Sequence, residues 1–515
     1  MSETRDAAGQ PAAAAEGQVT AHGLKRNLHA WEAIGLSVGA MSPALAMSFS
    51  GPGVAALVGR GAALSFVFAG VTCCLIGYGY MLLTRKYNHA GSVYGFVGAS
   101  LGPRTGVFSS WAMCLMYFVF VPASAAASGY FLAGVLQDIG WWKNADWIWL
   151  ALPITAIIWA FCAGVIRRST RALFYIEAVT VTLIIVLLVV ILVKVGQGHG
   201  INGGTLTATV FTLPSGVNIH ALLLGSVFGF LAFAGFEGAG ALGEETQNPG
   251  KAIPRAIGSS VVVLAVFYIA CIAVQSLGFG ANPKGSVAFA GSGGPLFQLA
   301  DVYVGGAMRD LIELGAAFSA FGAGLGAAVA GTRLIYAVSR DGAPKTPLAR
   351  VSQPSGSPRN AVVVVMVANL ICLIILRALS ATGLEVWQYL GTLGTLAILV
   401  GYGLVNVGAA RAVFDRSLGV AQWRGFLPSI AVILVGYVLY ANIYPAPSFP
   451  YNLFPYILLA WLVIGAAVIA FSPQLVRRVA AGLARDLGLP AGRVVGEVEP
   501  YPVEDLAADD LATDD

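Results

Sequence analysis

Two carboxylates lie inside long apolar runs and are the side chains best placed to do chemistry. Glu237 falls within Phe233-Ala-Gly-Phe-Glu-Gly-Ala-Gly240, and Glu177 lies about one and a half helical turns after the turn Arg167-Arg-Ser-Thr-Arg171. A carboxylate in hydrocarbon is costly unless it is hydrated, paired or protonated. Glu237 is therefore a candidate proton carrier or cation attractant, with an inert buried role as the alternative. For Glu177, a function and an ion pair with one of the preceding arginines are equally supported.

Glycine and proline interrupt two of the apolar runs. One interruption is Gly35-Leu-Ser-Val-Gly-Ala-Met-Ser-Pro43, and the other is the run that carries Glu237. Proline removes a backbone donor, and glycine weakens a helix by about 1 kcal/mol relative to alanine. We expect both helices to unwind within the membrane, where free N–H groups suit an anion and free carbonyls suit a cation. Close helix packing is the alternative, and we favour it for Gly225xxxGly229 and Gly322xxxGly326.

Motifs of other functional classes are weak. Gly35 to Gly39 matches GxSxG, but that nucleophile needs a strand-to-helix elbow and a His partner. Gly238 to Gly243 matches GxGxxG without a preceding strand. The six Cys lie in apolar runs without metal-ligand spacing, and no filter like that of a potassium channel occurs. We expect no enzyme activity, cofactor or metal site, and an intramembrane hydrolase and a channel remain distant alternatives.

The elements that hold these residues must be membrane helices. Of 515 residues, 57% are hydrophobic and only 10% are charged, whereas soluble domains are about a quarter charged. Backbone polar groups in a bilayer must be satisfied within the segment, which forces helix in runs too long for barrel strands. The twelve expected spans lie near residues 32–57, 61–84, 106–136, 147–166, 171–195, 220–243, 254–279, 307–338, 360–380, 386–410, 426–444 and 453–472.

Basic residues set the expected orientation. Most of the 29 Lys and Arg residues fall in alternate loops, which places both termini in the cytoplasm by the positive-inside rule. No signal peptide is expected before the first span. The net charge of +4 is too small and dispersed for nucleic-acid binding. The segment 474–489 is amphipathic and is predicted either to lie on the inner leaflet or to be solvated. We expect the acidic stretch after Arg493 to be disordered.

Three motifs resemble a known family of carriers. They are Gly235-Phe-Glu followed by Gly243-Glu-Glu-Thr-Gln-Asn-Pro-Gly-Lys-Ala-Ile-Pro-Arg255, then Gly331-Thr-Arg-Leu-Ile-Tyr-Ala-Val-Ser-Arg-Asp-Gly342, and the loop from Tyr87 to Gly102. In type and order they resemble the amino acid-polyamine-organocation permeases, over nearly all expected helices. The resemblance implies a LeuT-like fold of two inverted five-helix repeats with broken helices 1 and 6.

The resemblance also implies a division of the chain. The first repeat spans residues 31–200, the second spans 201–412, and two peripheral helices follow in 413–473. A cytoplasmic tail, 1–30, precedes them, and an amphipathic and acidic segment, 474–515, follows. We expect a monomer in the cytoplasmic membrane, in contact with lipid.

In relatives of this family the substrate carboxylate meets backbone amides at the first break and its amine meets carbonyls at the second. Here the resemblance implies amides from Val38 to Ala44, a stretch that contains Gly39, Ala40, Met41, Ser42 and Pro43, and the carbonyls of Leu231 and Ala234 beside Gly235. It further implies wall residues, which here are Met116, Phe233, Phe236 and Phe321.

Three positions depart from the family pattern. Leu231 stands where an aromatic lid is common, with Phe230 beside it, and Glu177 stands where some relatives carry a lysine. The stretch 320–331 lacks the hydroxyls that sodium-coupled relatives use. We therefore expect amino acid uptake by alternating access with proton coupling through Glu237, with Glu177 and Phe230 as further coupling or gating residues. An exchanger or a polyamine permease is the alternative.

Overall fold

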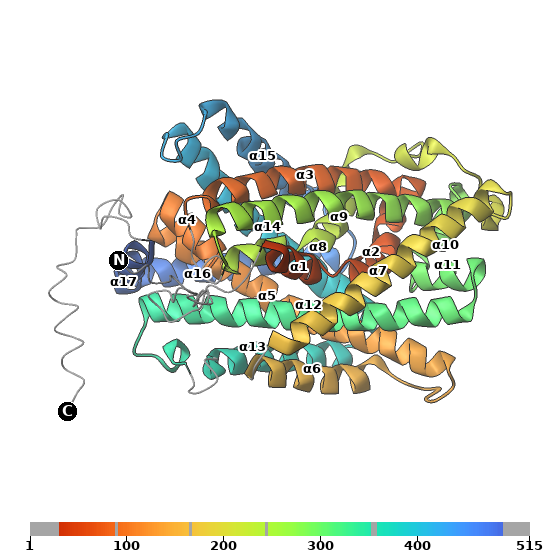
Figure 1. Ribbon diagram of the computed structural model, residues 1–515, viewed down its shortest axis with the longest axis horizontal. Helices are drawn as coiled ribbons and strands as arrows, with labels where there is room; N and C mark the ends of the chain where they lie inside the picture. Colours follow the sequence, from red (N-terminus) through yellow and green to blue (C-terminus); the bar gives the residue numbers. More distant parts are fainter. Residues whose placement is uncertain (1–29, 88–90, 164–166, 243–245, 352–357, 488–515) are drawn as a thin grey trace, which may run out of the picture.

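The computed structural model describes residues 30–87, 91–163, 167–242, 246–351 and 358–487, and every element assigned in these ranges is helical (Figure 1). The predicted all-α class is confirmed. The α-helices are α1 (Ala30–Met41), α2 (Pro43–Val58), α3 (Ala62–Thr84), α4 (Val93–Leu101), α5 (Pro103–Asp138), α6 (Trp147–Ala163), α7 (Arg167–Gly196), α8 (Ile219–Phe233), α9 (Pro249–Phe279), α10 (Pro283–Ala290), α11 (Pro295–Tyr303), α12 (Gly306–Gly342), α13 (Arg359–Ala378), α14 (Gly383–Phe414), α15 (Phe426–Ala441), α16 (Phe454–Phe471) and α17 (Pro473–Leu487).

Ten segments of the described chain are long and apolar enough to cross a membrane. The first, Ser37–Thr84, has 48 residues and includes both α2 and α3, while α6 is a shorter apolar helix of 17 residues. The expected total of twelve spans stays a prediction. The predicted spans near 106–136 and 307–338 correspond to α5 and α12, which have 36 and 37 residues and so exceed the roughly 20 residues that a bilayer requires.

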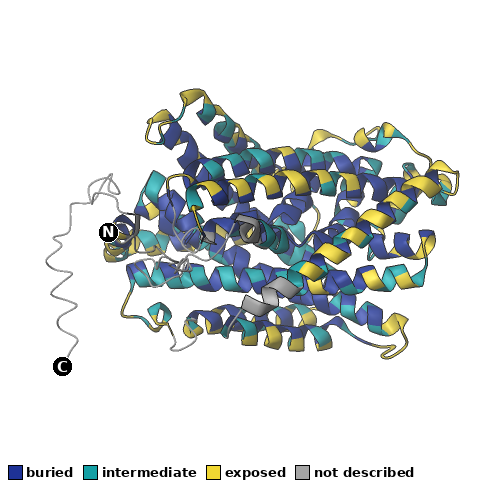
Figure 2. Cartoon of the chain, viewed as in Figure 1, coloured by how far each residue is buried: buried dark blue, intermediate teal, exposed yellow. Residues whose placement is uncertain are grey.

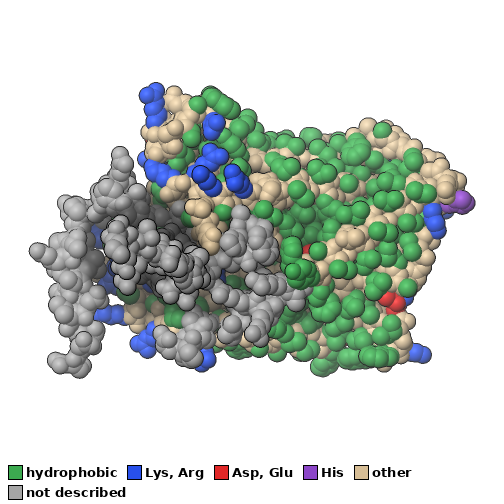
Figure 3. Space-filling view, viewed as in Figure 1, with side chains coloured by type: hydrophobic (Ala, Val, Ile, Leu, Met, Phe, Trp, Pro, Cys, Tyr) green, Lys and Arg blue, Asp and Glu red, His purple; other side chains and the backbone are tan. Residues whose placement is uncertain are grey.

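The helices sort into an inner and an outer set by burial. In the most apolar stretch of α5 and of α14, 78% of residues are buried inside the protein, whereas in α16 the share is 17%. Helix α7 crosses the front of the bundle and exposes apolar residues such as Val179 and Val189 along its length (Figures 1 and 2). Helix α5 packs along α12 and α14, and α3 packs along α9. Hydrophobic side chains cover most of the visible face of the molecule (Figure 3), as lipid contact requires.

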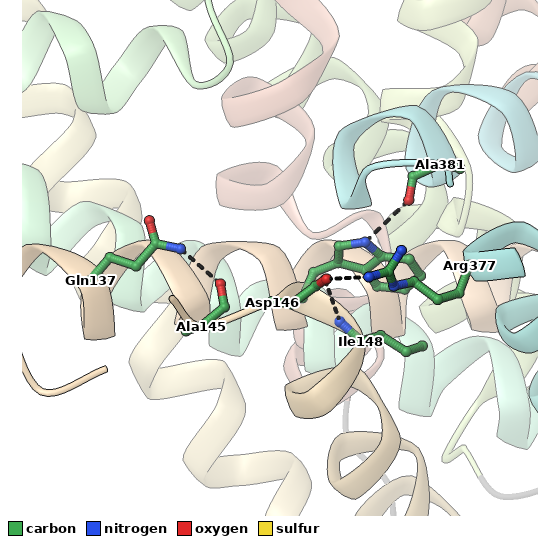
Figure 4. Close-up of polar contacts among 7 residues, drawn as sticks. Gln137, Ala145, Asp146, Ile148, Arg377 and Ala381 are labelled. Carbon is green, nitrogen blue, oxygen red and sulfur yellow. Dashed lines mark hydrogen bonds and ion pairs between the residues drawn. The ribbon is translucent and has the colours of Figure 1, made fainter. Parts of the chain in front are cut away.

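Polar contacts fix the turn between α5 and α6 to neighbouring helices (Figure 4). Arg377 at the end of α13 donates to the carboxylate of Asp146 at 2.7 Å. The indole N–H of Trp147 donates to the carbonyl of Ala381 at 3.2 Å, and the side-chain amide of Gln137 donates to the carbonyl of Ala145 at 2.8 Å. These contacts join α5 and α6 to the α13–α14 turn at one end of the bundle.

Helix α17 differs from both predictions made for residues 474–489. Its apolar residues Val479 and Leu483 are fully buried, and the helix packs against α12, α5 and α4. A Cβ placed on Gly342 of α12 would lie 2.4 Å from a methyl of Leu475, and one on Gly98 of α4 would lie 2.6 Å from a methyl of Leu483. The apolar face therefore covers protein, not lipid or water, because the ends of α12 and α4 offer a complementary apolar surface.

Candidate functional site

The first apolar run is broken at Ser42. This residue has φ 44° and ψ 64°, in the left-handed region that non-glycine residues rarely adopt. Its N–H donates to the carbonyls of Val38 and Gly39, both at 3.2 Å, and its hydroxyl donates to the Gly39 carbonyl at 2.8 Å. Pro43 then begins α2, where its fixed φ and missing N–H are tolerated. The expected break in the first helix is therefore present, between α1 and α2.

The second break lies between α8 and the 3-10 helix η4 (Phe236–Leu242). Helix α8 ends at Phe233, Ala234 is extended, and Gly235 has φ 116°. A Cβ on Gly235 would lie 2.7 Å from both the carbonyl carbon and oxygen of Ala40 and 3.0 Å from the N of Met41. Only glycine allows both this backbone conformation and this approach. The two breaks, almost 200 residues apart in the chain, are therefore in direct backbone contact.

Glu237 lies beside this contact and is 2% exposed. Its carboxylate oxygen Oε2 accepts hydrogen bonds from the N–H of Gly235 at 3.0 Å and from the hydroxyl of Tyr402 in α14 at 2.7 Å. The ring of Tyr402 lies 5.0 Å from that of Phe236 and 5.8 Å from that of Tyr80. The carboxylate is thus held in an aromatic surrounding and links η4 to α14.

Glu177 in α7 reaches the first break and is 6% exposed. Its Oε1 accepts from the N–H of Ala44 at 2.9 Å. The next amide, that of Leu45, donates to the hydroxyl oxygen of Ser319 at 3.2 Å, and Ser319 also hydrogen-bonds to Glu177. Together Glu177 and Ser319 cap the start of α2, since the Ser42 side chain does not. The side chains of the arginines proposed to pair with Glu177, at 167, 168 and 171, lie outside the described residues.

Sequence reasoning missed Ser319. Ser319 lies one residue before the stretch 320–331 of the eighth span, which contains no hydroxyl. The local sequence around Ser319 shows only a hydroxyl among small residues in an apolar helix. Such a hydroxyl commonly bonds to a carbonyl of the preceding turn, so its presence does not indicate a functional site. The contact itself depends on how α12 crosses α2, which no local pattern records.

The predicted wall residues are not all in one place. Phe233 and Phe236 are fully buried at the second break, where Phe233 packs on Tyr268 with ring centroids 5.1 Å apart. Met116 is 3% exposed on α5, and its backbone faces Gly394 of α14. Phe321 is half-buried and packs on Phe161 of α6, at 6.2 Å between centroids, toward the outer helices.

The residues at the expected lid position are buried. Phe230 and Leu231 are 0% and 2% exposed, and the Leu231 side chain packs against Gly391 of α14, where a Cβ would lie 2.7 Å from it. In contrast, a Cβ on Gly39 or Gly238 would meet no atom of the described residues within 4 Å. Each break therefore has one glycine that faces open space, so the contact between the breaks is not packed on every side.

Buried charge in the described part of the chain is of one sign. The buried ionisable acids are Glu177, Glu237, Glu313 and Asp341, and this buried set includes no Lys, Arg or His. Asp341 accepts from the hydroxyl of Tyr94 at 2.9 Å and pairs with the half-buried Arg340 at 2.9 Å. In the part of the chain that the structure describes, neither Glu177 nor Glu237 has a cationic hydrogen-bond partner. No group of three or more metal-ligating side chains occurs there either.

Comparisons with known proteins agree on the class of this fold and site. A family model described as amino acid permease matches residues 28–469. The chain is 26% identical over 354 residues to the branched-chain amino acid permease BcaP of Bacillus subtilis (strain 168), covering 65% of this chain and 71% of that protein. It is 23% identical over 211 residues to the low-affinity putrescine importer PlaP of Escherichia coli (strain K12), covering 40% and 45%.

A solved structure shares the arrangement of helices. The manganese transporter of Eremococcus coleocola, crystallised with an aromatic bis-isothiourea compound, matches with a TM-score of 0.51 at 12% identity, over 88% of this chain and 96% of that chain. At this identity the likeness shows the fold alone, which is LeuT-like as the motifs implied. The family match covers most of the chain and both breaks, so the chain belongs to the amino acid permease family of membrane transporters, within the amino acid-polyamine-organocation superfamily.

Proposed function

We propose that this protein is a secondary active transporter that moves an amino acid or an organic amine across the cytoplasmic membrane by alternating access. The single observation that carries the proposal is the backbone contact between the two helix breaks, Gly235 against Ala40 and Met41, beside the buried Glu237. Broken helices at the centre of a bundle offer backbone polar groups to a small solute. The related proteins named above are called carriers of branched-chain amino acids and of putrescine, and both kinds of solute bear an amino group.

The breaks also supply the hinges that alternating access requires. Helix α1 ends just before Ser42 and η4 begins just after Gly235, and both of these residues have unusual backbone dihedrals. The hydroxyl of Ser37 in α1 donates to the carbonyl of Phe236 at 3.0 Å. We infer that α1 and η4 move together against the rest of the bundle, and that solute binds where they meet α2 and α8.

Proton coupling is assigned to Glu237. Its Oε2 accepts two hydrogen bonds, from the N–H of Gly235 just before η4 and from the hydroxyl of Tyr402 in α14, an arrangement that suits the carboxylate anion. Protonation adds a donor and removes the charge, so the attraction of Tyr402 for Glu237 weakens. Because these two residues join η4 to α14, the protonation state of Glu237 biases the position of η4.

The proposal is tested by reconstitution. Purified protein is first screened by thermal shift against the twenty amino acids and common amines, because a ligand stabilises the state that it binds. The stabilising compound is then supplied in labelled form to proteoliposomes with an inward proton gradient. Saturable accumulation that collapses with a protonophore supports proton-coupled transport. Absence of uptake for every stabilising compound, with correctly oriented protein, contradicts the function.

Orientation is a separate part of the proposal. The distribution of Lys and Arg supports two cytoplasmic termini. A reporter that is active only in the cytoplasm, fused to the C-terminus, should be active in cells. Activity of a periplasmic reporter at the same position would contradict this orientation.

A further inference from the structure

We propose that Glu177 is a resident anion that fills the amide subsite at the start of α2, so that the transported solute is an organic amine without a carboxylate. This inference rests on the proposed transport function and names its substrate class. It assigns Glu177 as the residue that discriminates between an amine and the amino acid with the same side chain.

The backbone donors at the first break already have partners within the protein. Residues Val38 to Met41 lie in the last turn of α1, where N–H groups bond back along the helix. The N–H of Ser42 does the same, at 3.2 Å to Val38 and Gly39, and Pro43 has no N–H. The N–H of Ala44 donates to Glu177 at 2.9 Å.

The remaining donors of this turn are also satisfied. The N–H of Leu45 donates to Ser319 at 3.2 Å, and that of Ala46 donates to the carbonyl of Ser42 at 3.0 Å. Every amide from Val38 to Ala46 therefore has a partner inside the protein. The N-terminus of a helix attracts an anion. In this chain that anion is the side-chain carboxylate of Glu177 in α7.

The second break differs from the first, because it follows the C-terminal end of α8. A helix C-terminus presents carbonyl acceptors, whereas a helix N-terminus presents N–H donors. The last four carbonyls of a helix have no partner within it. For α8, the carbonyl of Leu231 accepts from Ala234 at 3.2 Å. Within the described chain, no backbone N–H from outside α8 donates to the carbonyls of Phe230, Ala232 or Phe233.

Three side-chain hydroxyls around the two breaks are already engaged as donors and are not available to an anion. The hydroxyls of Ser37, Ser42 and Tyr402 all donate to acceptors in the protein. The Tyr80 hydroxyl is buried without a partner, next to Phe236 and Tyr402; because a phenol both donates and accepts, it does not distinguish an ammonium group from a carboxylate. The carbonyls at the end of α8 and the two buried carboxylates are therefore the groups around the breaks that favour a donor-rich solute.

Charge leads to the same class of solute. Glu177 and Glu237 are buried, and the buried set of described side chains contains no Lys, Arg or His. A buried carboxylate is stable when it is paired or protonated. A second carboxylate, brought by an amino acid, would displace Glu177 from Ala44 and leave one of the two anions without donors. A solute that carries an ammonium group but no carboxylate supplies a positive charge to the buried carboxylates and adds no second anion.

Matched pairs of solutes test the inference, because decarboxylation changes one group and keeps the side chain. Inhibition constants are measured in proteoliposomes for cadaverine and lysine, putrescine and ornithine, agmatine and arginine, and 3-methylbutylamine and leucine. We expect the amine of at least one pair to inhibit at a concentration about tenfold or more below that of its amino acid. An amino acid that inhibits as well as or better than its amine in every pair overturns the inference while leaving transport itself intact.

Glu177→Ala provides the direct test of the residue. Removal of the carboxylate frees the N–H of Ala44 for a ligand, so the preference for the amine should fall by about tenfold or reverse in the same pairs. Glu177→Gln keeps the size and an acceptor without the charge, and is used if Glu177→Ala does not fold. The preference of this variant for the amine over the amino acid should fall as well.

Glu313→Gln is the matched control, because Glu313 is a buried acid on the same α12 helix as Ser319. This variant should keep the wild-type preference. An unchanged preference in both Glu177 variants contradicts the assignment. Failure of all solutes to be transported would contradict the proposed function instead.

Discussion

At the scale of single residues, the site consists of two carboxylates with different neighbours. Glu237 accepts from its own segment and from Tyr402, whereas Glu177 caps a helix that belongs to another part of the chain, 133 residues away. The first arrangement joins two elements through a group that can gain a proton, and the second satisfies backbone donors. We therefore assign coupling to Glu237 and solute selection to Glu177.

Glu237→Gln should abolish accumulation driven by a proton gradient while solute exchange continues. Glutamine keeps an acceptor for Tyr402 and Gly235 but cannot carry the proton. The measurement is uptake of labelled solute with and without the gradient, together with exchange at equal pH. Tyr402→Phe is the control: it removes the 2.7 Å hydrogen bond and keeps the carboxylate, so accumulation should shift along the pH axis without being lost. Undiminished accumulation by Glu237→Gln would refute the coupling role.

Gly235→Ala should destabilise the protein by about 2 kcal/mol. The new methyl would lie 2.7 Å from the Ala40 carbonyl, and the residue would have to adopt φ 116°. The measurement is the apparent melting temperature in detergent. Gly238→Ala, where nothing lies within 4 Å, is the matched control and should melt close to the wild type. Equal melting temperatures for the two variants would contradict the close approach of the breaks.

Gly39→Leu should weaken solute binding without unfolding the protein. A Cβ at Gly39 meets no atom of the described chain within 4 Å, so we expect the larger side chain to project into the space beside the first break and to compete with the solute. We expect the apparent affinity in thermal-shift titrations to fall about tenfold, a cost of about 1.4 kcal/mol, with little change in the melting temperature of the free protein. Unaltered affinity would argue against solute binding at this position.

At the scale of elements, helix breaks and helix caps decide which backbone N–H and carbonyl groups are free to bind a solute. The short helix α1 and the 3-10 helix η4 meet at their broken ends, and α7 and α12 supply the groups that complete α2. Helix α17 is held by the ends of α12, α5 and α4, so it acts as a part of the bundle.

Leu483→Ala should therefore lower stability by about 3 kcal/mol, as for other fully buried leucines. The measurement is again the apparent melting temperature in detergent, where no bilayer is present. Arg478→Ala, an exposed position on the same helix, is the control and should have little effect. If α17 instead lay on the leaflet, Leu483→Ala would leave the melting temperature in detergent unchanged.

At the scale of the whole molecule, the sequence predicted what depends on local patterns. Apolar run length placed α5, α12 and α14 within a few residues of their observed ends, and Pro43 with its neighbouring glycines marked the first break. The contacts of Glu177 with Ala44 and of Ser319 with Leu45 could not be predicted, because they join residues 133 and 274 positions apart through helix crossings. The short helices α4, α10 and α11 were also missed, because they are too short to show a span and lie in loops.

The central claim is that one solute site, built at the contact between the two breaks, opens to each side of the membrane in turn. Counterflow in proteoliposomes without any ion gradient tests it most directly. Vesicles preloaded with the unlabelled solute found by the binding screen should take up external labelled solute in a transient, saturable overshoot that empty vesicles do not show. A labelled flux that rises linearly with concentration and ignores the internal solute would contradict alternating access.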